Sequence, residues 1–153
     1  QLPGVGGPFT GREEEIDDAL RRLSGRAIVH RAPASMFPII SACDLALSAA
    51  GQTLYELAAC GRPAVAIEAA VNQRRQLHEF ASSGAVIRAG AATDAGIAAR
   101  AVSMATALAG QPDVLRAMAA AGPAFIDGQG ARRAARALLS LCAQHHAPGR
   151  LET

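Results

Sequence analysis

The hydrophobic pattern between residues 44 and 69 changes from a short apolar run to helical spacing and back. A short apolar run at 45–47 precedes apolar positions at helical spacing in 54–58, and residues 64–69 form a second run that only Glu68 interrupts. Unalternated runs of this kind are typical of parallel strands covered on both faces. The stretch therefore predicts a strand, a tight loop, a short helix and a second strand.

The rest of the chain repeats this alternation. The Gly-Arg-Pro sequence at 61–63 is expected to end the short helix, because Gly suits a helix C-terminus and Pro cannot continue it. Further strands are expected at 2–6, 27–30 and 85–89, and further helices at 12–23, 35–43, 72–83, 94–109, 111–121 and 129–143. This order indicates an α/β fold with a doubly wound, Rossmann-like parallel sheet. The 153 residues predict one domain at 1–143 and a tail at 144–153.

The charge pattern argues against a nucleic-acid partner. All 15 basic residues are Arg, which together with the abundance of Ala is typical of codon bias toward G and C. The arginines are scattered, and their one close cluster, Arg132, Arg133 and Arg136, falls on the polar face of the last predicted helix. We therefore expect no binding of nucleic acid.

Cysteine spacing and hydropathy suggest the compartment. Cys43, Cys60 and Cys142 show no C-x-x-C spacing and lie in apolar surroundings, as expected of buried thiols in a reducing compartment. The sequence has no signal peptide and no apolar run of about 18 residues, so we expect a soluble, cytoplasmic protein. Glu13–Glu15 are interpreted as the solvated first turn of a helix, and no metal or cofactor is expected.

Ligands of parallel sheets gather at the carboxyl ends of the strands, which singles out residues 48–56 and 68–76. Thr53 and Glu56 have the spacing of a capping box, in which Thr caps the helix and Glu reaches back to a backbone amide. The functional alternative is a helix start that binds an anion while Glu56 accepts hydrogen bonds from vicinal hydroxyls, such as those of a ribose. Asn72 has the same two interpretations, as a helix cap or as a ligand contact.

Other candidate chemistry is sparse. Glu68 is interpreted as a solvated residue at a strand end, and His30 as a solvated or hydrogen-bonded histidine at the end of another strand. The sequence contains no Ser-His-Asp set, metal-ligand cluster, Walker loop or G-x-G-x-x-G fingerprint. The residues alone therefore predict a ligand-binding α/β domain with no catalytic residue.

Three motifs carry a resemblance to a known family. They are Asp44-Leu-Ala-Leu-Ser-Ala-Ala-Gly-Gln-Thr-Leu-Tyr-Glu56, Gly61-Arg-Pro-Ala-Val-Ala-Ile67 and Asn72-Gln73. Together they resemble the C-terminal, nucleotide-sugar-binding half of GT-B-fold enzymes. The resemblance is strongest to the branch with the UDP-sugar hydrolases of pseudaminic acid synthesis and the spore-coat polysaccharide proteins, and weaker to the peptidoglycan N-acetylglucosaminyltransferase. It extends from about Gly6 to Leu141.

The resemblance implies that the chain binds a UDP-sugar and serves cell-surface polysaccharide synthesis in a glycosyltransferase or a UDP-sugar hydrolase. The residues implied to bind the UDP-sugar are Ala49, Ala50, Gly51, Gln52, Thr53, Glu56, Asn72 and Gln73. Glu56 would hold the ribose hydroxyls, the loop backbone would face the phosphates, and residues 72–73 would contact the sugar. The sequence departs from the family at Ala50, where Gly is usual, and at Gln52, where Ser or Thr is usual.

The resemblance also implies a missing part. The sequence lacks the family's catalytic N-terminal domain and the Gly-rich strand, loop and helix that begin the C-terminal half. The implied partner is therefore the N-terminal domain of the same protein, and the chain alone is expected to be inactive. In a doubly wound sheet with the strand order 3-2-1-4-5-6, strand 1 lies in the middle. If the strands of this chain are strands 2 to 6, the strands at 2–6 and 44–49 would flank the gap left by strand 1. A longer chain, a second copy in a homodimer, or direct pairing of the two strands would fill it. The alternative function is a degenerate interaction domain that binds no nucleotide.

Overall fold

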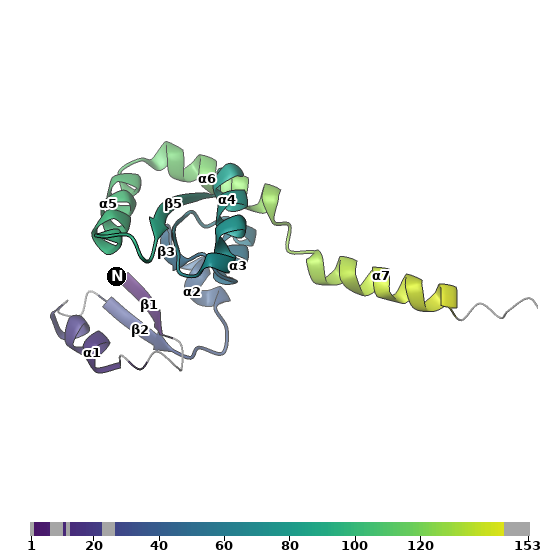
Figure 1. Cartoon of the computed structure of the whole chain (residues 1–153), viewed down its shortest axis with the longest axis horizontal. Helices are drawn as coiled ribbons and strands as arrows, with labels where there is room; N and C mark the ends of the chain where they lie inside the picture. Colours follow the sequence, from purple (N-terminus) through teal and green to yellow (C-terminus); the bar gives the residue numbers. More distant parts are fainter. Residues whose placement is uncertain (1, 7–10, 12, 23–26, 146–153) are drawn as a thin grey trace, which may run out of the picture.

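The computed structural model describes residues 2–6, 11, 13–22 and 27–145 and is an α/β structure with two small parallel sheets (Figure 1). The first sheet pairs β1 (Leu2–Gly6) with β2 (Ala27–Arg31). The second sheet has the order β3-β4-β5. Its strands are β3 (Ala46–Ala49), β4 (Ala64–Glu68) and β5 (Val86–Ala91). The predicted parallel α/β class is therefore confirmed.

Helices follow the strands as the hydrophobic pattern predicts. They are α1 (Glu13–Arg22), α2 (Phe37–Ser41), α3 (Thr53–Ala59), α4 (Arg74–Ser82), α5 (Ile97–Ala109), α6 (Pro112–Phe125) and α7 (Gly130–His145), and the 3₁₀ turn η1 (Val71–Gln73) precedes α4. Helix α2 is shorter than the predicted 35–43, with Pro38 in its first turn. Helix α6 is longer than predicted, because it continues through Gly122 and Pro123.

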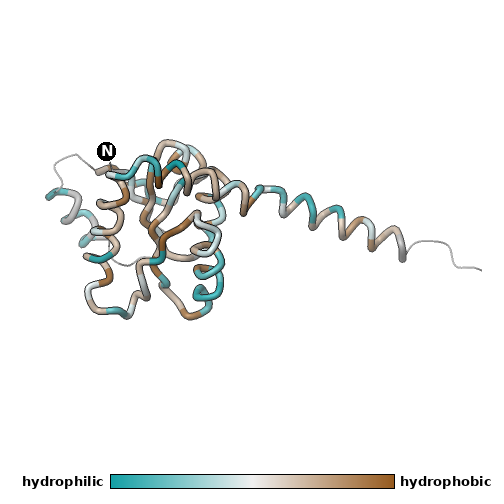
Figure 2. The backbone as a smooth tube through the Cα atoms, turned by 90° about the horizontal axis from the view of Figure 1, so that it is seen from above, coloured by the Kyte–Doolittle hydropathy of each residue, from teal (hydrophilic) through white to brown (hydrophobic). Residues whose placement is uncertain are grey.

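Helices cover both faces of the second sheet. Side chains of α3 and α4 pack on one face, and side chains of α5 and α6 pack on the other. The first core includes Leu54, Leu57, Leu77, Phe80, Ala64 and Ala66, and the second includes Val65, Ala89, Ala101, Leu108 and Met118. Figure 2 shows these hydrophobic segments (brown) gathered in the body of the molecule. Burial on both faces explains why β4 has no alternating pattern.

Gly61 ends α3 as the sequence predicts. It has a φ of +61°, a left-handed conformation that glycine adopts at little cost. The Gly61 amide donates to the Ala58 carbonyl at 2.9 Å, and the Arg62 amide donates to the Leu57 carbonyl at 2.8 Å. These two bonds form a Schellman motif, which satisfies carbonyls at the helix end and turns the chain into β4.

No strand pairing joins the two sheets within the residues that the structure describes. Among the described strands, β1 pairs only with β2 and β3 pairs only with β4, so the strands expected to flank a gap do not pair directly. Leu47 of β3 is 50% exposed, whereas the residues of β4 are almost all buried. The edge strand β3 is therefore less covered than the centre of its sheet.

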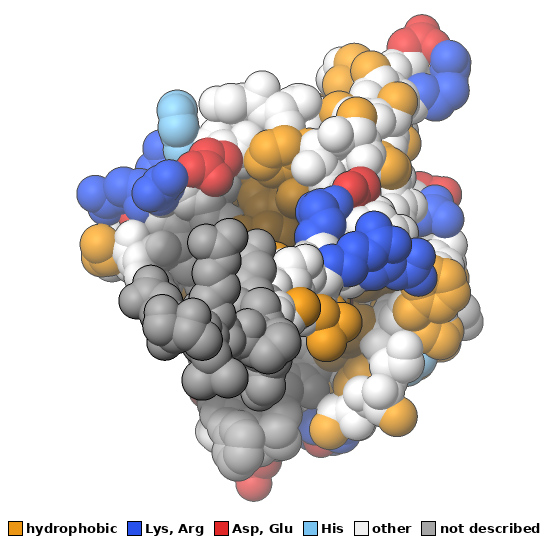
Figure 3. All heavy atoms as spheres, turned by 90° about the vertical axis from the view of Figure 1, so that its right-hand side faces the viewer, with side chains coloured by type: hydrophobic (Ala, Val, Ile, Leu, Met, Phe, Trp, Pro, Cys, Tyr) orange, Lys and Arg blue, Asp and Glu red, His pale blue; other side chains and the backbone are white. Residues whose placement is uncertain are grey.

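Helix α7 projects away from the body (Figure 1). Its predicted apolar stripe runs through Ala131, Ala134, Ala135, Leu138 and Cys142, and all of residues 130–143 are exposed. Leu138 is 63% exposed. The side of the molecule from which α7 projects carries hydrophobic and arginine side chains next to each other (Figure 3). Because residues 130–143 are all exposed, the apolar stripe of α7 lies in solvent in this structure and not against the domain.

Candidate functional site

The loops that follow β3 and β4 are bound to each other at the carboxyl ends of these strands. Nε2 of Gln76 in α4 donates to the carbonyl oxygens of Ala50 at 3.1 Å and Gly51 at 2.9 Å. Oε1 of Gln73 accepts a hydrogen bond from the Ala69 amide at 2.9 Å. A Cβ at Gly51 would lie 3.6 Å from Nε2 of Gln73, so the two loops are in contact. The sequence placed both loops at this edge, and the structure brings them together.

The β3–α3 loop has fewer available amides than expected. Ala50 is fully buried, and its amide donates to the Ile67 carbonyl of β4 at 2.8 Å. This amide cannot also face a phosphate, which corrects one of the predicted contacts. Among the described residues, no backbone acceptor is bonded to the amides of Gly51, Gln52 and Thr53. These three groups remain as possible donors to a ligand.

The capping-box interpretation of α3 is wrong. The N-cap is Gln52, whose backbone is already helical (φ −57°, ψ −35°), and no side chain makes a capping hydrogen bond there. Thr53 is consequently the first residue of the helix and not its cap. Asn72 does not cap a helix either, because it lies inside η1, which has Ala70 as its N-cap. The backbone of α3 thus leaves the Glu56 carboxylate free for another role.

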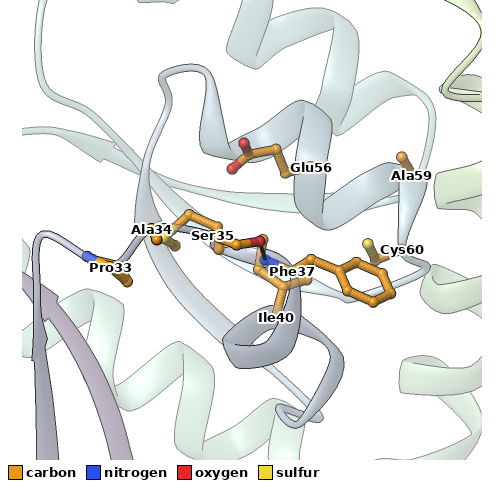
Figure 4. Close-up of a pocket in the computed structure, with 9 residues that line it drawn as sticks. Pro33, Ala34, Ser35, Phe37, Ile40, Glu56, Ala59 and Cys60 are labelled. Carbon is orange, nitrogen blue, oxygen red and sulfur yellow. Dashed lines mark hydrogen bonds between the residues drawn. The ribbon is translucent and has the colours of Figure 1, made fainter.

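Glu56 lies beside a cavity of about 480 Å³ between α3 and the segment 33–40 (Figure 4). The lining residues are Pro33, Ala34, Ser35, Met36, Phe37, Ile40, Glu56, Ala59 and Cys60. The Glu56 carboxylate projects from α3 over this segment, within which the Phe37 amide donates a hydrogen bond to the Ser35 hydroxyl at 3.3 Å. The Glu56 backbone carbonyl accepts a hydrogen bond from the Cys60 amide at 3.1 Å, but within the described part of the chain no hydrogen bond or ion pair involves the Glu56 carboxylate. The cavity therefore combines mostly apolar walls with one unengaged carboxylate.

The predicted site residues form two groups. Glu56 is the one that lines the cavity, and the sequence reasoning missed the segment 33–37 that forms the opposite wall. The others lie at the carboxyl ends of β3 and β4, from the last residue of β3 to the first of α3 and in η1, and Ala49, Gln52 and Asn72 are exposed there. No local signal could have identified the opposite wall, because it depends on where the β2–α2 connection lies in space.

Glu68 is buried and not solvated, which corrects its sequence interpretation. It is 4% exposed at the end of β4. Its Oε1 accepts from Nε of Arg74 at 3.0 Å, and its Oε2 accepts from Nη2 of Arg88 at 3.1 Å. Residue 88 is paired with Ala66, two positions before Glu68, which places Arg88 on the same face of the sheet. A lone charge in a buried run was the signal that such partners exist.

A second cavity lies between β1, β2 and α2. It measures about 450 Å³ and is lined by Pro3, Ile28, His30, Pro38, Ile39, Ala42 and Asp44. His30 and Asp44 are thus brought to one cavity from different elements, although no hydrogen bond joins them among the described residues. The described residues contain no group of three or more His, Cys, Asp or Glu side chains placed to hold a metal ion.

Comparisons with protein-family models, with curated proteins and with solved structures find no match to this chain. In the portion that the structure describes, no helix is both long enough and apolar enough to cross a membrane. The arrangement itself therefore carries the functional argument: a cavity with an acidic rim, and two connected loops at the carboxyl edge of a parallel sheet.

Proposed function

We propose that this chain binds the nucleotide part of a nucleotide sugar, as the C-terminal half of a GT-B-fold glycosyltransferase or UDP-sugar hydrolase. One observation carries the proposal: an unengaged Glu56 carboxylate at the rim of a mostly apolar cavity of about 480 Å³. This volume is within the usual range for small-molecule sites. Apolar walls suit a planar base, and an ionised carboxylate can accept hydrogen bonds from two vicinal ribose hydroxyls.

The surroundings of Glu56 support this assignment. Phe37 lines the cavity and is 65% exposed, so an aromatic side chain is accessible to a ligand there. The available amides of Gly51, Gln52 and Thr53 lie three to five residues before Glu56, at the start of α3, and are candidates to bind the phosphates. The resemblance of residues 44–73 to the UDP-sugar-binding half of GT-B enzymes favours uracil as the base.

The test is calorimetric titration of the chain with UDP and with UDP-N-acetylhexosamines. Each charge-assisted hydrogen bond contributes about 1.5–3 kcal/mol, so Glu56→Ala and Glu56→Gln should each weaken UDP binding at least about tenfold. Glu79→Gln is the matched control, because Glu79 is also an exposed helical carboxylate but is paired with Arg75 at 3.0 Å. Equal binding by the parent and both Glu56 variants, or no binding of UDP by the parent, would refute the proposal.

We expect no turnover of a nucleotide sugar by this chain alone. The described residues include no nucleophile hydrogen-bonded to a base, so we expect the purified chain to release no sugar from a UDP-sugar. Detection of free UDP above the rate without protein would contradict this expectation.

The second candidate function is an interaction domain that binds no nucleotide. The exposure of every residue in 130–143, including Leu138 and Leu139, favours it. Failure of UDP titration, together with self-association that depends on α7 in sedimentation, would select this alternative.

A further inference from the structure

Glu68 holds two arginines that come from different elements. Arg74, the first residue of α4, places both Nε and Nη2 at 3.0 Å from Oε1 of Glu68. Arg88, in β5, places Nη2 at 3.1 Å from Oε2. The Glu68 side chain is only 3% exposed, so its position is fixed by the protein around it. Both carboxylate oxygens are thereby used to orient guanidinium groups.

The arginines keep most of their donors for another group. The Arg74 side chain is 64% exposed and the Arg88 side chain is 49% exposed. A guanidinium has five N–H donors, and Glu68 accepts one hydrogen bond from Nε of Arg74 and one from Nη2 of Arg88. One carboxylate between two guanidiniums also leaves the cluster with one excess positive charge. Neutralising the charge of Glu68 would require only one arginine, and the second arginine satisfies the other oxygen of the buried carboxylate.

Neighbouring charges do not cancel this excess. Among the described residues, no other carboxylate is paired with Arg74 or Arg88. Asp94, after β5, is paired with Arg100 at 3.4 Å. Arg75 is paired with Glu79 at 3.0 Å and has no contact with Glu68. The excess charge is therefore local to Arg74 and Arg88, at the strand ends where parallel sheets bind ligands.

We propose that Arg74 and Arg88, positioned by buried Glu68, form a binding site for an oxyanion. Guanidinium groups recognise phosphate and carboxylate through paired N–H donors, and preorganisation by Glu68 lowers the conformational entropy lost on binding. The shared ligand chemistry is a phosphate or a carboxylate group. This site contains neither Glu56 nor its cavity, so it does not depend on nucleotide binding.

NMR titration of the parent chain tests the site directly. The arginine Nε–Hε signals are followed at low ionic strength while inorganic phosphate is added in one series and glucuronate in another. We expect saturable shifts of the Arg74 and Arg88 signals, with the Arg75 signal unmoved. Saturation by phosphate alone identifies a phosphate site, and saturation by glucuronate identifies a site that also takes sugar carboxylates. Both results support the proposal, whereas shifts spread evenly over the arginines, or no saturation with either anion, overturn it.

Three variants that each remove one positive charge separate the site from general attraction of anions. Arg74→Gln and Arg88→Gln should each weaken binding at least about tenfold, because each loses charge-assisted bonds to the anion. Arg75→Gln is the matched control and should change the affinity less than about twofold, as expected of an exposed charge outside the site. Equal weakening in all three variants overturns the proposal. If Arg88→Gln does not fold, Arg74→Gln and the Arg88 signal of the parent decide.

Discussion

Gly122 of α6 lies directly against the backbone of Ala58 in α3. A Cβ at position 122 would come within 2.5 Å of the Ala58 carbonyl oxygen, and 3.2 Å from the Ala58 carbonyl carbon. No flexible side chain could move aside to relieve such a contact, because the atoms concerned belong to a helix backbone. The two helices therefore require a residue without a side chain at this crossing.

Gly122→Ala should destabilise the domain by about 1–3 kcal/mol through overpacking, although alanine is the better helix former. Urea unfolding measures the change. Gly110→Ala is the control, because its Cβ would meet only the Ala107 carbonyl at 3.6 Å, an ordinary contact. A midpoint that is unchanged or raised in Gly122→Ala would show that the helices separate easily.

Phe80→Ala should lose about 3–5 kcal/mol of stability, since Phe80 is 1% exposed. Its ring also packs edge-to-face with Tyr55 and Phe125, at centroid distances of 5.0 and 5.2 Å. Phe37→Ala serves as the comparison, because Phe37 is 65% exposed and its loss should change stability by less than about 0.5 kcal/mol. Similar unfolding midpoints for both variants would contradict the position of Phe80 in the core.

Gly61→Ala should cost more than Gly128→Ala, although both glycines have nearly the same left-handed φ, +61° and +68°. At Gly128 a Cβ would meet nothing within 4 Å, so only the backbone strain of about 1–2 kcal/mol is expected. At Gly61 a Cβ would also approach the Ala119 carbonyl to 3.0 Å. Thermal unfolding of the two variants measures the cost of this contact. Equal losses of stability would mean that α6 moves to accommodate the added methyl group.

Cys43 should react with iodoacetamide more slowly than Cys142 near neutral pH. Burial raises the pKa of the Cys43 thiol, and the nearby Arg62 lowers it only in part. A raised pKa leaves less of the reactive thiolate at a given pH, and Cys43 is also less accessible than the exposed Cys142. Mass spectrometry of partly labelled protein gives the two rates. In urea the difference should disappear, and equal rates in the folded protein would argue against burial.

The sequence predicted the elements better than their contacts. The apolar run at 64–69 was enough to predict β4, and the Gly-Arg-Pro sequence at 61–63 was enough to predict the end of α3. In both cases the burial or the backbone conformation is specified within a few residues. The end of α6 was misjudged since Gly and Pro normally stop a helix, whereas Gly122 here serves the contact with Ala58.

The candidate sites depend on register and on loop placement. Arg88 follows Glu68 by twenty residues in the chain. It reaches Glu68 only because β5 pairs with β4 in one particular register. Glu56 could be selected from its place after a strand, but the segment 33–37 could not, because no local pattern relates it to α3. Side chains within one element were thus predictable, and partners from separate elements were not.

Helix α7 has a consequence for how the protein responds to heat. Its 16 residues are near the length at which an isolated helix is only marginally stable in water, and its described side chains through Ala143 are exposed. Such a helix melts gradually by itself, whereas α3 to α6 unfold cooperatively with the core around Leu77 and Phe80. Circular dichroism should therefore show a gradual early loss of helix before the main transition, and amide hydrogens of α7 should exchange long before those of the sheet.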